Sequence, residues 1–299
     1  MLYSTVAAHE KRRLFRERLS TGELLRFPGA FNPLSARLIE RSGFDGVYIS
    51  GAVIAADLGL PDIGLTTLTE VATRGRQIAR MTDLPTIIDA DTGFGEPMNV
   101  ARTVHELEDA GLGGLHIEDQ VNPKRCGHLD GKQVVDEQTA VGRIRAARDA
   151  RRDDNFLIMA RTDIRAIDGL DAAVDRAKAL VDAGADAIFP EAMATLHEFA
   201  AMRAAVDVPI LANMTEFGKS ELFTTEQLAS VGINIVIWPV SLLRIAMGAS
   251  ERALETITTE GSLTSKLGEM QHRADLYDLV DYRGYTAFDS TIFDFTVER

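Results

Sequence analysis

Cysteine, positive charge and long apolar runs are all scarce in this sequence. Among 299 residues there is one cysteine, Cys126, so the chain cannot form an intramolecular disulfide bond. No apolar run reaches the length of about 18 residues that a membrane-spanning helix requires, and residues 9–18 are too charged for a signal peptide. Lys and Arg number 32 against 45 Asp and Glu, and the net charge of −13 disfavours binding to nucleic acid or to an anionic membrane. We therefore expect a cytoplasmic protein with neither nucleic acid nor membrane as a partner.

The overall composition is that of a folded globular protein. Apolar residues make up 45% of the chain and charged residues 26%, which excludes the disordered, collagen-like and coiled-coil classes. A chain of 299 residues is long enough for one large domain or two ordinary ones. No linker or low-complexity stretch divides it, so we expect residues 1–299 to form a single domain.

Four segments repeat one pattern, in which a helical stretch ends at a glycine and a short apolar run follows. These segments are RSGFDGVYIS at 41–50, DAGLGGLHIE at 109–118, DAGADAIFPE at 182–191 and SVGINIVIWP at 230–239. Glycine suits the left-handed conformation that commonly follows a helix C-terminus, and the apolar run after it is typical of a buried strand. The repeats therefore predict the helix-to-strand joints of a βα architecture.

The spacing of apolar runs predicts an α/β fold built from eight strand–helix units. The candidate strands cover roughly 24–28, 46–50, 85–90, 114–118, 155–161, 187–190, 209–213 and 234–238. Helical patterns lie between them, for example at 68–81, 98–110, 137–150 and 169–183. Most of the strands are apolar throughout, as in a parallel sheet that is covered by helices. Eight units in about 250 residues favour a (β/α)8 barrel of the TIM type, with a doubly wound sheet and an appended domain as the alternative.

A C-terminal extension from about 260 to 299 follows the predicted barrel. It has a helical pattern over 263–280 and an aromatic-rich stretch over 282–295. These residues are more apolar than a solvated tail requires. We expect the extension to pack against another surface, such as a neighbouring subunit.

Polar side chains gather at the C-terminal ends of the predicted strands, where the active site of such a barrel lies. Two residues spaced i, i+2 on a strand point to the same face of the sheet. The alternative is that each acidic residue caps the next helix, which explains single positions better than the whole set. The strand-end residues are Tyr48, Ser50, Gly51, Asp89, Asp91, His116, Glu118, Asp119, Arg161, Asp163, Glu191, Asn213 and Thr215.

Three of these carboxylates suggest a site for a divalent cation. Asp89 and Asp91 follow one strand, and Glu118 ends the next strand along the chain. Carboxylates and water are the ligands of hard cations such as Mg²⁺, with Mn²⁺ as a second option, whereas Zn²⁺ favours more His or Cys. His116 is either a further ligand or a hydrogen-bonding neighbour. The sequence therefore predicts a Mg²⁺ site at Asp89, Asp91 and Glu118.

The polar segment 119–135 is long for a connection between a strand and a helix, and long loops at this end of a barrel are often active-site lids. It places Lys124, Arg125, Cys126 and His128 close together in the chain. Neighbouring cations lower the pKa of a thiol and prepare it for proton transfer. The alternative is an inert cysteine, although a polar loop is an unusual place for a structural one.

These motifs resemble those of the isocitrate lyase/phosphoenolpyruvate mutase superfamily, and above all its 2-methylisocitrate lyases. KRCGH at 124–128 resembles the signature loop of the superfamily, and the similarity extends over roughly 20–285. The other matching elements are SGA at 50–52, LGLPD at 58–62, DADTGFG at 89–95, HIEDQ at 116–120, ARTD at 160–163, Phe189-Pro-Glu191, NMTEFG at 213–218, Arg244 and Arg273. The chain departs from the pattern at Ala52, where many relatives have glycine.

The resemblance implies a (β/α)8 barrel whose last helix is exchanged between paired subunits of a homotetramer. It also implies a reaction, the Mg²⁺-dependent, retro-aldol-like cleavage of the tricarboxylate (2S,3R)-2-methylisocitrate to pyruvate and succinate. This carbon–carbon lyase reaction belongs to the methylcitrate cycle of propionate degradation. Cys126 is implied to be the acid that protonates the succinate carbanion, with Lys124 and His128 tuning it.

Further residues are expected to contact the substrate or to take part in proton transfer. Arg161 and Arg244 suit its carboxylates, because a guanidinium group grips a carboxylate through two hydrogen bonds. Tyr48 is a candidate for removing the hydroxyl proton, and Asp62 has a family counterpart to which we assign no role. The other implied contacts are Ser50, Gly51, Ala52, Cys126, Gly127, Glu191, Asn213, Met214, Thr215 and Arg273.

Other functions remain open at this point. Isocitrate lyase activity differs by one methyl group of the substrate, which a pocket discriminates by only about 1–3 kcal/mol. Phosphonopyruvate-type enzymes and oxaloacetate decarboxylases of the same superfamily share the two aspartates but generally lack the KRCGH loop. A non-catalytic scaffold barrel would have no need of the acids, arginines and cysteine together.

Overall fold

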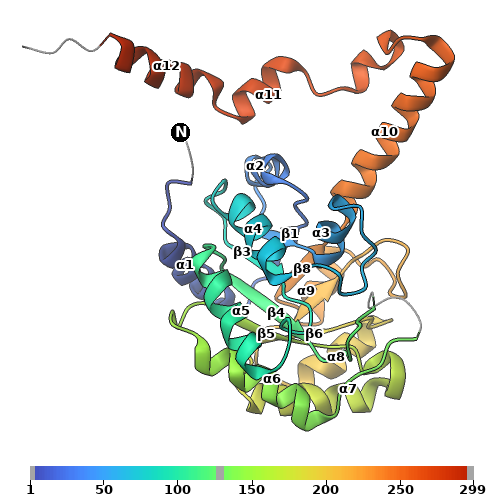
Figure 1. The fold of residues 1–299 in the computed structure, drawn as a ribbon. Coiled ribbons are helices and arrows are strands. Elements are labelled where there is room, and N and C mark those ends of the chain that lie inside the picture. The colour runs from blue at the N-terminus through green and yellow to red at the C-terminus, as the bar shows by residue number, and fades with distance from the viewer. Residues whose placement is uncertain (1–3, 126–130, 295–299) are drawn as a thin grey trace, which may run out of the picture.

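The structure is a computed structural model that describes residues 4–125 and 131–294, and within these ranges eight strands form a parallel barrel (Figure 1). Each strand coincides with a segment predicted from the sequence. The strands are β1 (Leu25–Pro28), β2 (Val47–Ile49), β3 (Thr86–Asp89), β4 (Gly114–Glu118), β5 (Leu157–Thr162), β6 (Ala187–Pro190), β7 (Leu211–Asn213) and β8 (Ile235–Trp238).

Hydrogen bonding closes the strands into a ring. Five strands pair in the order β2-β3-β4-β5-β6, three pair in the order β1-β8-β7, and every pairing is parallel. Two isolated parallel bridges join these sheets, Gly29 to Tyr48 between β1 and β2, and Ile188 to Ile210 between β6 and β7. The prediction of a (β/α)8 barrel is therefore confirmed, and the doubly wound alternative is wrong because an open sheet has no such closure.

Helices surround the ring. They are α1 (Ala8–Ser20), α2 (Pro33–Arg41), α3 (Gly51–Asp57), α4 (Leu68–Ala79), α5 (Pro97–Asp109), α6 (Glu137–Ala150), α7 (Arg165–Asp182), α8 (Leu196–Ala205), α9 (Thr225–Ser230), α10 (Ser241–Glu260), the 3₁₀ helix η1 (Thr264–Glu269), α11 (Arg273–Leu279) and α12 (Tyr282–Phe293). In the described residues no helix combines the length and the apolar character needed to cross a bilayer.

Two apolar cores explain why the strands are apolar on both faces. Leu157 and Met159 of β5 belong to the inner core, together with Phe15 of α1, which packs against Phe27 of β1. Ile158 lies between them in sequence and belongs to the outer core under the helices. Because side chains alternate along a strand, each strand must supply apolar residues to both cores.

The predicted joint glycines adopt the expected backbone conformation. Gly43, Gly111, Gly184 and Gly232 have φ between 74° and 106°, in the region that disfavours residues with a side chain. Each ends a helical segment just before a barrel strand, as the repeated pattern predicted.

The chain leaves the barrel along α10, as Figure 1 shows, and η1, α11 and α12 then run back past α2. We name α10 to α12 the C-terminal arm. Only Thr256 of α10 is buried, whereas Ile245 and Leu254 are 68% and 64% exposed. A guanidinium nitrogen of Arg37 in α2 donates to the Leu279 carbonyl of α11 at 3.2 Å. The arm therefore presents much of its apolar surface away from its own barrel.

Candidate active site

The C-terminal ends of the strands surround a polar cavity of about 230 Å³. Barrel strands with parallel directions bring residues from distant parts of the sequence to this one end. Of the residues predicted from the sequence, those lining the cavity are Tyr48, Ser50, Ala52, Asp62, Asp89, Lys124, Arg161, Glu191, Asn213, Thr215 and Arg244.

Asp89 and Asp91 lie beside the first turn of α3. The Gly51 amide donates to Asp89 Oδ2 at 3.2 Å, and the Asp91 amide donates to Asp89 Oδ1 at 3.0 Å. A Cβ atom on Gly51 would lie 2.9 Å from Asp89 Oδ2 and 3.3 Å from Asp91 Oδ1. Asp91 itself has φ of 46°, an unfavourable conformation for a residue with a side chain. The backbone here is thus shaped to bring two carboxylates together.

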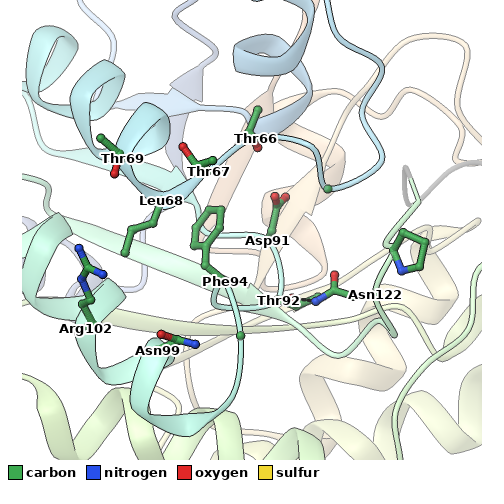
Figure 2. A pocket seen from close by; sticks show the side chains of 13 residues that line it. Thr66, Thr67, Leu68, Thr69, Asp91, Thr92, Phe94, Asn99, Arg102 and Asn122 are labelled. Atoms are coloured by element: carbon green, nitrogen blue, oxygen red, sulfur yellow. Dashed lines mark hydrogen bonds between the residues drawn. The ribbon is translucent and has the colours of Figure 1, made fainter.

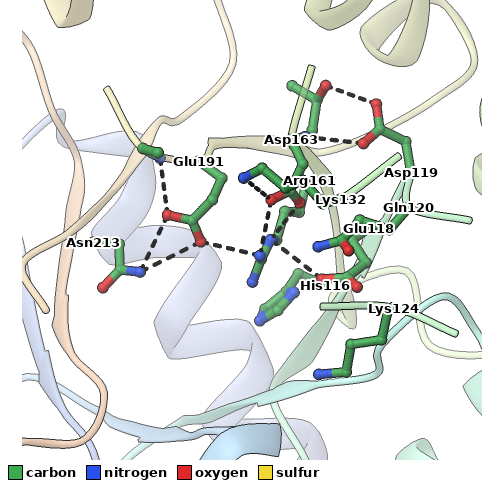
Figure 3. Close-up of polar contacts among 12 residues, drawn as sticks. His116, Glu118, Asp119, Gln120, Lys124, Lys132, Arg161, Asp163, Glu191 and Asn213 are labelled. Carbon is green, nitrogen blue, oxygen red and sulfur yellow. Dashed lines mark hydrogen bonds and ion pairs between the residues drawn. The ribbon is translucent and has the colours of Figure 1, made fainter. Parts of the chain in front are cut away.

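Glu118 and Arg161 form the buried centre of the site (Figure 3). Arg161 Nε lies 3.3 Å from Glu118 Oε2, while Glu118 Oε1 is buried without a hydrogen-bond partner among the described residues. Burial raises the pKa of Glu118 well above its usual value, although Arg161 opposes the shift. On the opposite side, Arg161 Nη2 lies 3.2 Å from Glu191 Oε2, and the Asn213 amide group donates to both Glu191 oxygens at 3.4 Å.

Lys124 brings a positive charge from segment 119–135 into this acidic environment. Its ammonium group lies 2.8 Å from Asp91 Oδ1 and also pairs with Asp62. Burial disfavours the charged form, but the surrounding carboxylates of Asp89, Asp91, Glu118 and Asp62 outweigh burial and raise the pKa of Lys124. Asp62, for which the sequence suggested no role, therefore holds this lysine.

Tyr48 and His116 form a neutral pair in the barrel interior. Tyr48 Oη lies 2.8 Å from His116 Nε2, and His116 Nδ1 lies 3.8 Å from Asp89 Oδ1. Burial lowers the pKa of His116 to about 4 despite the nearby Asp89 charge, so the imidazole is neutral at pH 7. Burial and Asp89 raise the pKa of Tyr48 well above its usual value. His116 is thus a hydrogen-bonding neighbour that holds the Tyr48 hydroxyl.

The donor set fits a hydrated hard cation. No three His, Cys, Asp or Glu side chains converge as a ready-made ligand group within 4–125 and 131–294. Mg²⁺ commonly keeps several waters and takes only one or two protein carboxylates. Asp89 and Asp91 can supply these, and the unpartnered oxygen of Glu118 can accept from a metal-bound water. The residues present therefore fit Mg²⁺ or Mn²⁺ better than a cation enclosed by three protein ligands.

Arg244 lies at the rim of the cavity. One of its guanidinium nitrogens lies 3.1 Å from Thr215 Oγ1 and 2.7 Å from Glu216 Oε2. Its side chain is 38% exposed. A substrate carboxylate can therefore reach Arg244 from solvent, whereas the Arg161 side chain is only 8% exposed and meets a ligand inside the cavity.

The structure leaves several predicted residues away from the cavity. The Met214 side chain is buried in the outer core, where its sulfur accepts from the Phe223 amide, because it points opposite to its neighbours in sequence. Arg273 is exposed at the start of α11 in the C-terminal arm. Cys126, Gly127 and His128 lie outside the described residues.

Other residues of the site were not assigned a role from the sequence. Asp163 was recognised only as a strand-end residue, yet its carboxylate binds both Arg161 and Lys132. Its spacing of two from Arg161 was the one available signal. Lys132 itself could not have been found from spacing, because its partner is 31 residues away.

A second, larger cavity of about 680 Å³ lies next to the first and is lined by Asp91 (Figure 2). Thr66, Thr67 and Thr92 contribute much of its polar wall. The Asn122 amide group donates to Thr92 Oγ1 at 2.8 Å and ties segment 119–135 to the loop after β3. Asp91 therefore lines the second cavity, whereas Asp89 lines the first.

A parallel barrel with carboxylates, arginines and a buried lysine at its strand ends defines an enzyme for small anionic molecules. The chain belongs to the phosphoenolpyruvate phosphomutase family, which residues 15–258 match. The membership expected from the sequence motifs is confirmed.

Relatives of this chain carry a consistent set of names. A Corynebacterium glutamicum protein named "Probable 2-methylisocitrate lyase 2" is 59% identical, and the match covers 99% of this chain and 96% of that protein. The 2-methylisocitrate lyase of Escherichia coli is 45% identical over 94% of this chain and 95% of its own.

Two solved structures of enzymes have a similar fold. One of 2,3-dimethylmalate lyase has a TM-score of 0.89 at 33% identity and covers 99% of this chain and 100% of its own. Another, of phosphonopyruvate hydrolase with oxalate and Mg²⁺, has a TM-score of 0.85 at 28% identity and covers 94% and 98% of the two chains.

Proposed function

We propose that this protein is a 2-methylisocitrate lyase that cleaves (2S,3R)-2-methylisocitrate to pyruvate and succinate within propionate degradation. The observation that carries the proposal is the joint presence of two neighbouring carboxylates, Asp89 and Asp91, and the buried Arg161 at the C-terminal ends of the strands, where Asp89 and Arg161 line the first cavity and Asp91 lines the second. Relatives that bear this name and cover nearly the whole chain support it. A tricarboxylate requires this combination, since its charges must be balanced while one carbon–carbon bond breaks.

Arg161 and Arg244 both line the cavity and bind carboxylates of the substrate. Arg161 is fixed by Asp163, Glu118 and Glu191, so its orientation is set before a ligand arrives. Arg244 at the rim meets a second carboxylate from solvent. Ser50, Gly51, Ala52, Asn213 and Thr215 complete the binding surface around them, and Gly127 and Arg273 are assigned to the same role.

We assign Mg²⁺, or Mn²⁺ in its place, to Asp89, Asp91 and Glu118. When bound, this cation supplies stabilisation of the negative charge that develops on substrate oxygens as the bond breaks. Lys124 contributes a second positive charge next to Asp91, and Asp62 keeps it there. The local charge of the mouth is thereby favourable for an anion although the chain carries −13.

Two residues move protons in this scheme. Tyr48 accepts the proton of the substrate hydroxyl as the carbonyl of pyruvate forms, and its own phenolic proton passes to Nε2 of the neutral His116, to which it is hydrogen-bonded. Cys126 delivers a proton to the carbanion that becomes succinate, and Lys124 and His128 adjust its acidity. One carbon–carbon bond breaks, one carbon–hydrogen bond forms, and no oxidant or reductant is needed.

We also propose a cytoplasmic homotetramer in which each chain is a single barrel domain with an extension from about 260 to 299. The support is the C-terminal arm, which exposes Ile245 and Leu254 from α10 and Phe288 from α12. An arm exchanged between paired subunits covers this surface. It also offers a way for Arg273, which is remote from its own cavity, to reach a site.

A substrate comparison tests the proposed activity. Release of the oxo-acid product is measured with coupled assays at saturating Mg²⁺, as pyruvate from 2-methylisocitrate, 2,3-dimethylmalate and oxaloacetate and as glyoxylate from isocitrate. We expect kcat/KM to be highest with 2-methylisocitrate. A higher value with any of the other three acids assigns the enzyme to that substrate and overturns the proposal.

A further inference from the structure

Behind the cavity, a network of buried charges connects Arg161 to segment 119–135. Asp163 is fully buried, and its two carboxylate oxygens face Arg161 Nε at 3.0 Å and Nη2 at 3.2 Å. Lys132 Nζ lies 2.9 Å from Asp163 Oδ1, and its side chain is only 3% exposed. The carboxylate of Asp163 thus bridges a substrate-facing guanidinium and a lysine that never reaches the cavity (Figure 3).

Lys132 lies at the base of segment 119–135. The Val121 amide donates to the Gln133 carbonyl and the Val135 amide donates to the Asp119 carbonyl, both at 2.8 Å. These bonds, with an antiparallel bridge from Gln120 to Val134, pair the two stems of the segment. The backbone next to Lys132 is therefore fixed, and its ammonium group has a defined position.

A similar set of contacts holds the other stem, which begins at Asp119. Asp119 accepts from the Asp163 amide at 2.9 Å and from Thr162 Oγ1 at 2.7 Å. Arg176 of α7 lies 2.9 Å from Asp119 Oδ2 and donates to the Val135 carbonyl at 3.1 Å. Both stems are thus attached to the end of β5, which carries Arg161.

The charges around Arg161 indicate that Lys132 affects the electrostatics of the site as well as its structure. Three carboxylates, of Glu118, Asp163 and Glu191, lie within 3.3 Å of one guanidinium group. Without Lys132, Arg161 would be the one cation on Asp163 among the described residues. The positive charge of Arg161 would then be compensated mainly by Asp163, and the guanidinium group would attract a ligand carboxylate less strongly.

We propose that Lys132 is a positioning residue, which acts through Asp163 to keep Arg161 oriented and available for a substrate carboxylate. Lys132 neutralises Asp163, and Asp163 fixes two of the guanidinium nitrogens. This inference deepens the proposed function, because it rests on Arg161 as a carboxylate-binding group.

Lys132→Met tests this proposal, since methionine keeps much of the apolar length and removes the charge. Lys11→Met is the matched control, because Lys11 is also buried but donates to the carbonyls of Ala79 and Thr82 near the start of β3. The measurements are kcat and KM for 2-methylisocitrate, the dissociation constants of succinate and oxalate by calorimetry with Mg²⁺, and the Tm of each variant.

For Lys132→Met we expect KM and both dissociation constants to rise about tenfold, with a smaller change in kcat, as for the loss of one charge-assisted contact. Lys132→Arg should restore most of the affinity. Lys11→Met should lower Tm and leave affinity unchanged. If Lys132→Met does not fold, the same changes in KM and in the two dissociation constants are expected for Lys132→Gln.

Wild-type affinity for both dicarboxylates in folded Lys132→Met or Lys132→Gln overturns the proposal, as does an equal loss in Lys11→Met. The failure of the proposed function gives a different result. In that case the wild-type enzyme does not cleave 2-methylisocitrate, while the oxalate affinities of the variants still report on Lys132.

Discussion

Gly51 sets how closely the start of α3 approaches the two aspartates of the candidate metal site. Because a Cβ atom would lie 2.9 Å from Asp89 Oδ2, Gly51→Ala must move that carboxylate or the helix. We expect Mg²⁺ affinity to fall by about 10–100-fold, the usual effect of disturbing the support of a metal ligand. A calorimetric Mg²⁺ titration measures it.

Gly142→Ala is the control for that substitution, because nothing lies within 4 Å of a Cβ placed on Gly142 in α6. This variant should gain about 0.5–1 kcal/mol of stability as a mid-helix glycine is replaced, with Mg²⁺ affinity unchanged. Unchanged Mg²⁺ binding in Gly51→Ala would show that the metal lies elsewhere.

Cys126 is the residue whose removal should separate chemistry from binding. We expect Cys126→Ala and Cys126→Ser to lose most turnover, since general acid catalysis contributes about 10²–10⁴-fold. Mg²⁺ affinity and Tm should stay at wild-type values. Turnover near the wild-type rate in either variant would remove Cys126 from the proton transfer.

At the residue scale, the sequence predicts single-strand features better than contacts between segments. Asp89, Glu118 and Arg161 were accessible to prediction because each follows the alternation of its own strand. Lys132 and Arg176 were not, since their partners Asp163 and Asp119 are 31 and 57 residues away. Such pairs depend on how strands β4 and β5 and helix α7 are placed in space.

Among the elements, the strands were predicted well because each must serve two apolar cores and each follows a glycine or turn signal. The predicted helix over 169–183 matches the main part of α7. In the structure α7 spans Arg165–Asp182, and Gly169, with φ of 86°, interrupts it after its first turn. The start of the predicted helix therefore coincides with this interruption, and the turn at 165–168 lay outside the prediction.

The C-terminal arm carries a prediction about assembly. Leu254→Asp places a charge on the exposed apolar face of α10, where Leu254 is 64% exposed. If the arm docks on a second copy, the substitution should shift the protein to a smaller oligomer, because burying an unpaired charge costs several kcal/mol. Light scattering after size-exclusion chromatography measures the mass.

Ile167→Asp on α7 is the control for the arm, with Ile167 44% exposed. Its oligomeric state should match that of the wild type. A wild-type mass for Leu254→Asp, or an equal loss of mass in both variants, would contradict docking through α10.

For the whole molecule, metal binding and stability should be linked. We expect EDTA to abolish activity and Mg²⁺ to restore it. A ligand that binds only the folded state raises Tm by mass action, so Tm should increase with Mg²⁺ concentration. Asp89→Asn should lose that dependence. Full activity after exhaustive chelation would refute the metal assignment.

The unfolding free energy should also depend on pH through His116. Burial lowers its pKa to about 4, below the ordinary value of 6.5, so the unfolded chain binds the proton more readily between these values. The stabilisation by neutral His116 is present above pH 6.5 and is lost as pH falls through 4. Burial and the charge of Asp89 raise the pKa of Asp91 to about 6. Asp91 has the opposite effect, because the folded protein binds its proton more readily and the unfolding free energy therefore falls as pH rises.

Comparing the wild type with His116→Gln isolates the contribution of His116, because Asp91 affects the unfolding free energy of both proteins. In EDTA, the difference in unfolding free energy between wild type and variant should grow by roughly 3 kcal/mol from pH 4 to 6.5. Denaturant titrations at several pH values measure it. A difference that stays constant over this range would show that His116 has an ordinary pKa.

The two single bridges that close the barrel divide its catalytic mouth into halves. Asp89, Glu118 and Arg161 belong to the five-stranded sheet, while Asn213 and Arg244 lie on or after strands of the three-stranded sheet. A displacement along these seams would change the spacing of the halves while leaving the ladders inside each sheet intact. A substrate that contacts both Arg161 and Arg244 therefore connects the two sheets, and its binding stabilises the closed barrel.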